Sequence, residues 1–396
     1  MTGSRPRSNT RPEVKRIARN EVREVGKFDM TIFLVVLALV GIGVIMVFSA
    51  SHMIAANRAV FGNNAYHFLQ RNAMFASVGF VLMVITSFVN YDVVRRFSGI
   101  IYIIAVVLLI AVVGFGVAAG GAVRWFVIPG TGIQIQPSEM ARAAVIFIVA
   151  SLVEKFPDAL KTWKGLFMIS GFVGVIVVLI ALPGGFSAML ITSAIGFSMI
   201  FIASPHFWRF VAMGGAGAAA LGGFFAWDVL ISGGFRGGRF VAWLDPFSDP
   251  LGVGFQTIQS LYAIASGGLF GLGIGQSRQA SFVPEPHNDI IFAIIVEELG
   301  LLGAGLILTL FGILIWRGVI IALNAPDTFS SMTAMGIVFA FAYPAIINVA
   351  VVTNSIPNTG VNLPFISYGG TSLIVSMTLA GVLLNISRYA KRERSA

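Results

Sequence analysis

Long apolar runs recur along the chain and are separated by shorter polar connections. A run of about 20 apolar residues can cross the hydrocarbon core of a bilayer as a helix. The pattern therefore predicts an all-α polytopic membrane protein with about ten transmembrane helices, at about 30–49, 71–90, 98–119, 138–153, 166–182, 186–204, 208–231, 289–316, 331–352 and 368–388. No internal repeat is visible, which argues against a transporter built from inverted repeats.

The longest polar connection, residues 232–288, separates the seventh and eighth predicted helices and is predicted to be a large extracellular loop. Within it, residues 255–269 have helical spacing of apolar positions, with Ile258, Leu261, Tyr262 and Ala265 on one face. We expect an amphipathic helix along the membrane surface. The membrane domain then spans 29–388, between basic cytoplasmic tails at 1–28 and 389–396, and its first helix is expected to stay uncleaved.

The composition agrees with a membrane protein and excludes several kinds of site. The chain is 57% hydrophobic and only 11% charged, whereas a soluble domain carries about 25% charged residues. It has no cysteine, which excludes disulfides and thiolate metal sites, and its four histidines lack the spacing of a metal motif. No metal site is predicted.

The net charge of +9 follows from topology and does not indicate nucleic-acid binding. With the N-terminus in the cytoplasm, most of the 26 lysines and arginines fall on inner segments, as the positive-inside rule expects. Both termini are then cytoplasmic. The basic residues left on the outer side are all arginines, whose planar group suits phosphate or carboxylate: Arg58, Arg71, Arg124, Arg142, Arg236, Arg239 and Arg278.

One stretch concentrates carboxylates at the start of the eighth helix. Pro286 ends the loop, Asp289 lies at the mouth of the apolar run, and Glu285 and His287 precede it. Further carboxylates, Glu297 and Glu298, follow deeper in the helix. Such groups are costly to bury in a membrane and are functional candidates. The alternative is that Asn288 caps the helix and Asp289 only complements its dipole.

Other polar motifs have both structural and functional interpretations. Glu139 and Arg142 are spaced to pair on one helix face, although Pro137 and Glu139 also suit an ordinary helix start. Arg124 and Trp125 could form an interfacial anchor. The remaining segments are best read as turns or flexible backbone, or leave both interpretations open: Asp245-Pro246, Asp249-Pro250, the glycines of 267–275, the segment 357–360 and the segment 363–372.

Taken together, these motifs resemble the SEDS family (shape, elongation, division and sporulation), which includes FtsW, RodA and SpoVE. The matching stretches run in the family's order from residue 48 to residue 372: FSAS, RW, QPSEMAR, DPFSDPLGVGFQ, QSLYAIASGGLFGLGIGQS, VPEPHNDIIFAIIVEELGLLG and LPFISYGGTS. FSAS and EELG are more similar to the division and sporulation branch than to RodA.

The resemblance implies a ten-helix peptidoglycan glycosyltransferase that polymerises lipid II at the outer face of the bacterial cytoplasmic membrane. A class B penicillin-binding protein and other division proteins are the implied partners. The family's presumed catalytic aspartate aligns with Asp289, its loop tryptophan with Trp125, and its charged pair with Glu139 and Arg142. The chain departs from the family pattern at Arg142, where lysine is more usual, at Asn288 and Ile290, and at 182–185, which lacks an expected acid.

The implied reaction inverts the anomeric centre, so it needs a base and a way to stabilise the leaving pyrophosphate. Asp289 is the predicted base, and Glu285 and His287 are predicted to orient the sugar or tune Asp289. The pyrophosphate is expected to be held by a divalent cation or by arginines among Arg124, Arg142, Arg236 and Arg239. No other cofactor is expected. Two alternatives are a lipid II flippase and a scaffold for division proteins.

Overall fold

The computed structural model describes residues 26–390, apart from 120–121, 129, 131–132, 213, 216, 218–222 and 224–234. Eight helices in this part of the chain are long and apolar enough to cross a membrane. They are α2 (Met30–Asn57), α3 (His67–Phe88), α4 (Tyr91–Phe115), α6 (Trp163–Ala181), α7 (Phe186–Ala203), α11 (Ile291–Leu323), α12 (Thr328–Val352) and α13 (Gly370–Tyr389). The predicted all-α polytopic class is therefore confirmed.

The predicted helix at 138–153 is present as α5 (Pro137–Lys155), which contains four charged residues and is almost entirely buried. The predicted helix at 208–231 lies largely outside the described residues, as do most of both basic tails, so the number ten stays a prediction. Helical segments of the long loop are α9 (Phe235–Leu244) and α10 (Phe255–Gly267). Short 3-10 turns complete the fold: η1 (Ala59–Phe61), η2 (Ala159–Lys161), η3 (Pro246–Ser248) and η4 (Gln279–Ser281).

The glycine-rich segment after α4 contains β-strands, although the sequence predicted no strand in this chain. It forms a three-stranded antiparallel sheet in the order β1 (Val117–Ala119), β2 (Ala122–Ile128) and β3 (Ile133–Ile135). Val117 pairs with Trp125, and Phe126 with Ile135. Pairing satisfies backbone groups that a free loop near a membrane would leave open, and it holds Arg124 on a strand.

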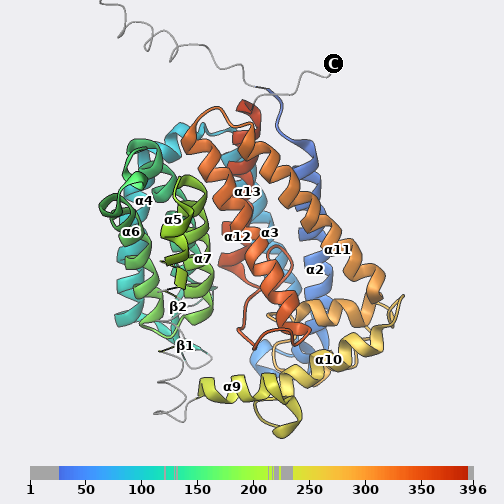
Figure 1. The fold of residues 1–396 in the computed structure, drawn as a ribbon. Coiled ribbons are helices and arrows are strands. Elements are labelled where there is room, and N and C mark those ends of the chain that lie inside the picture. The colour runs from blue at the N-terminus through green and yellow to red at the C-terminus, as the bar shows by residue number, and fades with distance from the viewer. Residues whose placement is uncertain are drawn as a thin grey trace, which may run out of the picture.

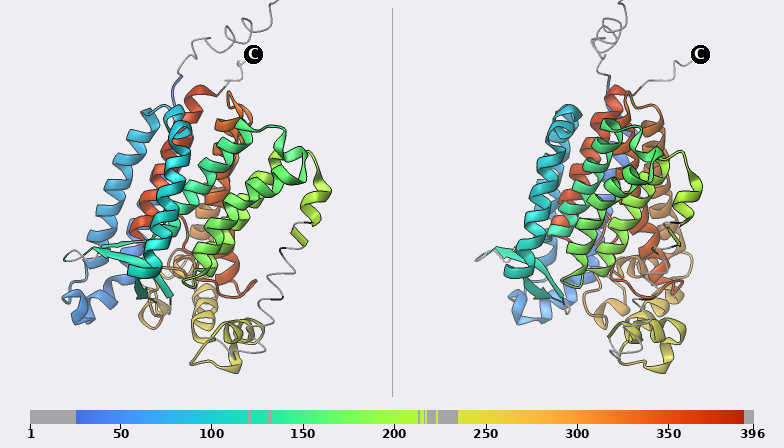
Figure 2. Two further views of the ribbon diagram at one scale, coloured as in Figure 1. Left: turned by 90° about the vertical axis from the view of Figure 1, so that its left-hand side faces the viewer. Right: turned by 60° about the vertical axis from the view of Figure 1, so that its left-hand side comes forward.

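The helices form one bundle around α5 and α12, with α3 packed closely against α13 (Figure 1). A small residue makes that approach possible: a Cβ on Gly381 would lie 2.4 Å from the carbonyl oxygen of Met83. Helices in membranes commonly approach at such small residues. The sheet, α9 and α10 gather at the end opposite the C-terminus (Figures 1 and 2). We call this the loop end, and the end where α2 starts and α13 finishes the terminal end.

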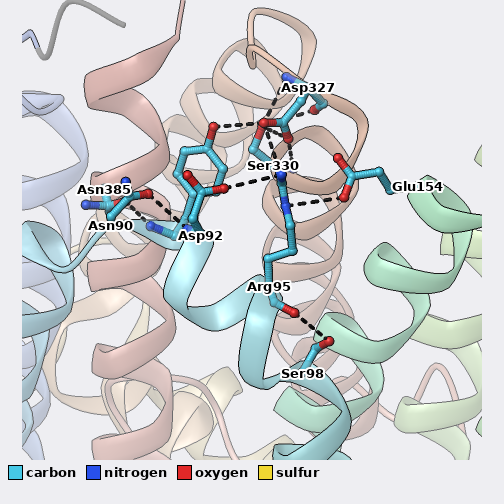
Figure 3. A network of polar contacts seen from close by, with 9 residues as sticks. Asn90, Asp92, Arg95, Ser98, Glu154, Asp327, Ser330 and Asn385 are labelled. Atoms are coloured by element: carbon cyan, nitrogen blue, oxygen red, sulfur yellow. Dashed lines mark hydrogen bonds and ion pairs between the residues drawn. The ribbon is translucent and has the colours of Figure 1, made fainter. Parts of the chain in front are cut away.

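A polar network joins α4, α5 and α12 at the terminal end (Figure 3). Arg95 lies 2.7 Å from an oxygen of Asp327 and 3.2 Å from one of Glu154. The Tyr91 hydroxyl donates to Asp327 at 2.8 Å, and Asp327 also caps α12 by accepting from the backbone of Ser330. This network fixes three helices whose other contacts are mostly apolar.

Helix α11 is broken at Gly300, whose backbone angles (φ 69°, ψ −171°) are almost exclusive to glycine. The break frees carbonyl groups, which accept from the glycine-rich segment after α10: Leu272 N donates to Glu297 O at 2.9 Å, and Gly273 N to Glu298 O at 3.0 Å. In return, Leu301 N donates to Gly268 O at 2.9 Å. The glycines therefore serve close backbone docking, which fixes α10 beside α11.

The Asp327 network should contribute measurably to stability. Although burial opposes it, hydrogen bonds from Ser330 and Tyr91 together with the charge of Arg95 lower the pKa of Asp327. A lowered carboxyl pKa stabilises the fold above the ordinary value of 3.8, and this stabilisation is lost as the pH falls below it. Asp327→Asn should cost about 1–3 kcal/mol at pH 7, measured by thermal unfolding in detergent. Asp158→Asn, which breaks an exposed pair with Lys161, should change little; equal losses would contradict the assignment.

The break in α11 yields a second prediction. A Cβ on Gly300 would lie 2.3 Å from the Leu269 carbonyl oxygen, whereas one on Gly305 would meet nothing within 4 Å. Gly300→Ala should therefore lose about 2 kcal/mol or more, since it adds backbone strain to a clash. Gly305→Ala, in the same helix, should be neutral or slightly stabilising. Thermal unfolding of both variants checks this, and a neutral Gly300→Ala would show that the loop is not docked as described.

Candidate functional site

Asp289 lies at the loop end, just before α11, where three distant segments meet. Its carboxylate oxygen Oδ1 accepts from Gln256 Nε2 of α10 at 3.2 Å. Its backbone carbonyl accepts from the Asn348 side chain of α12 at 2.5 Å, and the same amide donates to Val361 O at 2.7 Å. The residue is thus held through both its side chain and its backbone.

The capping interpretation of this stretch is wrong. The residue at the N-cap of α11 is Ile290, and no side chain caps the helix. The Asn288 side chain instead donates to Glu285 at 2.7 Å. With no helix amide occupying its carboxylate, Asp289 is free for another role.

Burial raises the pKa of Asp289, and the nearby charge of Glu285 adds to the shift. A hydrogen bond from its own backbone, the charge of Arg239 and the Gln256 hydrogen bond act in the opposite direction without cancelling it. A carboxyl group with a raised pKa holds a proton more readily, as a general base requires.

One predicted arginine, Arg239, acts on this carboxylate, and a second, Arg124, interacts with Arg239. Arg239 of α9 donates to the Asn358 carbonyl at 3.4 Å and acts electrostatically on Asp289. Arg124 of β2 donates to the Gly184 carbonyl at 2.6 Å. Burial, followed by the charge of Arg239, lowers the pKa of Arg124, so the two cations share one region. Neighbouring half-buried cations favour binding of an anion. Arg236 begins the same helix, but its side chain lies outside the described residues.

His287 and Glu285 differ from each other in their surroundings. The His287 ring is only 3% exposed and lies 4.2 Å from the Phe68 ring and 5.3 Å from the Tyr368 ring, centroid to centroid. Burial lowers the pKa of His287 to about 3, so it is neutral at physiological pH. The ring packs against these aromatic side chains, and its contact with a sugar stays a prediction. Glu285 is exposed and has a left-handed backbone (φ 52°), which points to a constrained turn.

The other predicted residues are not joined to Asp289 by hydrogen bonds among the described residues. Glu139 and Arg142 pair at 2.9 Å, both buried, in the first turns of α5. Trp125 lies partly buried on β2. The predicted Glu139–Arg142 ion pair is therefore present, but its part in substrate binding stays a prediction.

Glu297 and Glu298, deeper in α11, serve the docked glycine segment. The Ser277 hydroxyl donates to Glu297 at 2.5 Å, and the backbone of Arg278 donates to the same carboxylate at 3.1 Å. The Ser49 hydroxyl of α2 donates to Glu298 at 2.6 Å. These contacts tie the loop to α11 and α2, which gives both buried carboxylates a structural role.

The turn interpretation of the two Asp-Pro steps is confirmed. Asp245 caps η3 by accepting from Phe247 N at 3.1 Å, and Asp249 accepts from Gly252 N at 3.1 Å. The residues that sequence reasoning missed are uncharged amides: Gln256, Asn348 and Asn358. Both Gln256 and Asn358 belong to stretches singled out above, but an amide gives no charge signal, and nothing in the sequence joins α10 to the α12–α13 loop.

A divalent cation stays a prediction. Within the described residues, no group of three or more His, Asp or Glu side chains could hold a metal. Asp289 and Glu285 lie close enough to interact electrostatically. Together with substrate phosphates, one or two carboxylates can hold Mg²⁺. No step described below depends on such an ion.

The fold and this cluster define a polytopic helical membrane protein with a carboxylate–arginine site at one end. Residues 29–392 match the family model described as cell cycle protein, the FtsW, RodA and SpoVE family. The stage V sporulation protein E of Bacillus subtilis is 40% identical over 92% of this chain and 98% of its own length. An FtsW of Trichlorobacter lovleyi, named a probable peptidoglycan glycosyltransferase, is 38% identical over 93% of this chain and 95% of its own. The chain belongs to the FtsW, RodA and SpoVE family.

Solved structures support the fold independently. A chain from a peptidoglycan synthase complex that coordinates polymerization and crosslinking superposes with a TM-score of 0.75 at 24% identity, covering 92% of this chain and 99% of that one. The rod shape determining protein RodA of Thermus thermophilus gives a TM-score of 0.67 at 22% identity, over 92% and 98% of the two chains. This chain therefore shares its polytopic helical fold with these two proteins.

The buried state of His287 can be tested by its effect on stability. An unfolded chain protonates this histidine below its ordinary pKa of 6.5, whereas the folded chain does so only near 3. The free energy of unfolding should therefore fall as the pH decreases between these values, by up to about 1.4 kcal/mol per pH unit. His287→Leu should reduce this slope, whatever its effect at pH 7, and His206→Leu, at an exposed residue, is the control. Equal slopes in wild type and His287→Leu would mean that the ring is not buried as described.

Proposed function

We propose that this chain is a peptidoglycan glycosyltransferase that polymerises lipid II, an undecaprenyl-pyrophosphate-linked disaccharide peptide, with Asp289 as the general base. The observation that carries the proposal is the cluster of Asp289, Arg239 and Arg124. It combines a carboxyl group of raised pKa with Arg239, whose charge acts on that group, and with Arg124, which interacts with Arg239. Family membership and the names of the relatives support the same reaction.

The chemistry assigns one task to each side of the cluster. Asp289 takes the proton from the acceptor sugar hydroxyl while that oxygen forms a bond to the anomeric carbon of the donor. The bond from the anomeric carbon to the pyrophosphate breaks on the opposite side, so the configuration inverts. Arg124 and Arg239 stabilise the negative charge on the leaving undecaprenyl pyrophosphate. Glu139 and Arg142, which form a buried ion pair, contribute to substrate binding.

We infer that the loop end faces outside the cell and that both termini are cytoplasmic. Several basic side chains, including Arg95, Lys155 and Arg388, belong to the terminal end, in accord with the positive-inside rule. The site then meets lipid II from the outer leaflet of the cytoplasmic membrane. A class B penicillin-binding protein is the proposed partner, in division or sporulation, because a structural relative comes from a complex that couples polymerization with crosslinking.

The decisive variant is Asp289→Asn, which keeps the shape and removes the base. It should reduce glycan-strand synthesis from purified lipid II by about 100-fold or more, with the penicillin-binding partner present and its own catalysis disabled. Because the pKa of Asp289 is raised, wild-type turnover should also fall on the acid side at a higher pH than an ordinary aspartate would give. Folding should be preserved, since loss of a buried charge relieves its desolvation.

Asp245→Asn, at an exposed carboxylate of the same loop end that caps η3, is the matched control and should retain turnover. Equal strand synthesis by wild type and Asp289→Asn would remove Asp289 as the base. If neither made strands with the partner bound, lipid II translocation in vesicles would become the function to test, followed by a scaffold role.

A further inference from the structure

The carboxylate of Asp289 is reached by a chain of amides whose direction is fixed. Gly360 N donates to Asn358 Oδ1 at 3.1 Å. Asn358 Nδ2 donates to Gln256 Oε1 at 2.9 Å, and Gln256 Nε2 donates to Asp289 Oδ1 at 3.2 Å. A backbone N–H can only donate, so it sets the orientation of the Asn358 amide, which in turn sets that of Gln256.

The two oxygens of Asp289 are therefore not equivalent. The Gln256 side chain donates to Oδ1 of this carboxylate. Oδ2 faces Gly360, where a Cβ would lie 3.6 Å from that oxygen. Gly360 has φ +66°, a conformation that disfavours any side chain there. Gly360 therefore places no side-chain atom of its own beside Oδ2.

The amides are supported by the elements that carry them. Gln256 lies in the first turn of α10, which presses on α11 so closely that a Cβ on Gly267 would lie 2.0 Å from the Val296 carbonyl oxygen. Asn358 is held through its backbone carbonyl by Arg239. Asn348 ties the α12–α13 loop to Asp289 itself. Each amide in this hydrogen-bonded series is therefore held in place, as residues that position a catalytic group must be.

We propose that Gln256 and Asn358 are positioning residues that orient Asp289 so that Oδ2 receives the proton of the acceptor hydroxyl. The inference rests on the proposed role of Asp289 as the base. Donation by Gln256 also favours the ionised carboxylate, which is the form that can act as a base. Glu285 opposes that form, Arg239 supports it, and Arg124 acts on Arg239.

Two nearly isosteric substitutions, one at Gln256 and one at Asn358, reverse the donor direction of the amide hydrogen bonds. Gln256→Glu replaces the donor to Asp289 by an acceptor. Asn358→Asp keeps an acceptor for Gly360 N but removes the donor to Gln256, so the Gln256 amide turns and presents its oxygen to Asp289. In both variants the ionised base loses a donor, and its protonation should become easier.

The experiment is the pH dependence of the maximal rate of strand synthesis by the full chain with its partner. Both variants should move the acid limb to higher pH, by about one unit or more, and recover rate at the alkaline end. Gln259→Glu places the same charge one turn along α10, on a side chain without a hydrogen bond among the described residues, and should move the limb less. Thermal unfolding and retained lipid II binding confirm that each variant is folded.

The outcomes separate this inference from the proposed function. If the variants lowered the rate at every pH without moving the acid limb of the pH profile, the positioning role would be overturned. It would also be overturned if Gln259→Glu moved the acid limb equally far. If Asp289→Asn kept wild-type turnover in the same assay, the assignment of the base would fail and the positioning role with it. If Asn358→Asp did not fold, the comparison of the acid limbs of Gln256→Glu and Gln259→Glu would by itself decide the positioning role.

Discussion

The site depends on one buried amide. Asn348 is 1% exposed inside α12, and its Nδ2 donates to both the Asp289 carbonyl and the Val361 carbonyl. These acceptors belong to two irregular segments that meet at the loop end, the start of α11 and the α12–α13 loop. A carbonyl left without a donor at this depth would cost several kcal/mol. Satisfying both with one side chain fixes Asp289 relative to Asn358, and so determines the geometry of the amide chain.

The same constraint explains the broken helix. A bundle of regular helices satisfies its own backbone but leaves no irregular surface on which to assemble a polar site. Breaking α11 at Gly300 exposes carbonyls, and the glycine segment after α10 satisfies them with its own amides. Glu297 and Glu298 then accept from the rest of that segment and from Ser49. In the sequence, Glu297 and Glu298 resemble catalytic candidates. In the structure, they stabilise the irregular backbone that brings Gln256 to Asp289.

The sequence predicted the elements well because long apolar runs and proline or glycine boundaries are local signals. Most described helices lie within a few residues of their expected ranges, although α2, α4 and α11 each extend about seven or eight residues further at one end. Asp289, Arg124 and Arg239 were nominated from the charge pattern. It did not predict the sheet that carries Arg124, since short strands between glycines give little periodicity. Nor could it find Gln256, Asn348 and Asn358, because an uncharged amide acquires its role only through its partners, which lie from 13 to 102 residues away in the sequence. The surroundings of His287 were also not predicted: its sequence neighbours suggested a polar site, while its spatial neighbours are aromatic.

The surroundings of Asp289 and Arg124 disfavour the charged forms of both side chains. Burial and Glu285 disfavour the ionised form of Asp289, and burial together with Arg239 disfavours the charged form of Arg124. A pyrophosphate placed between the arginines would offset their mutual repulsion. The stabilisation would be greatest when its leaving oxygen carries full charge, which is the condition for catalysis rather than tight ground-state binding. A rigid backbone is what makes this possible, because side chains free to move apart would relax the repulsion before the substrate arrived. The amide that holds two irregular segments in place and the electrostatics of the site are therefore parts of one arrangement.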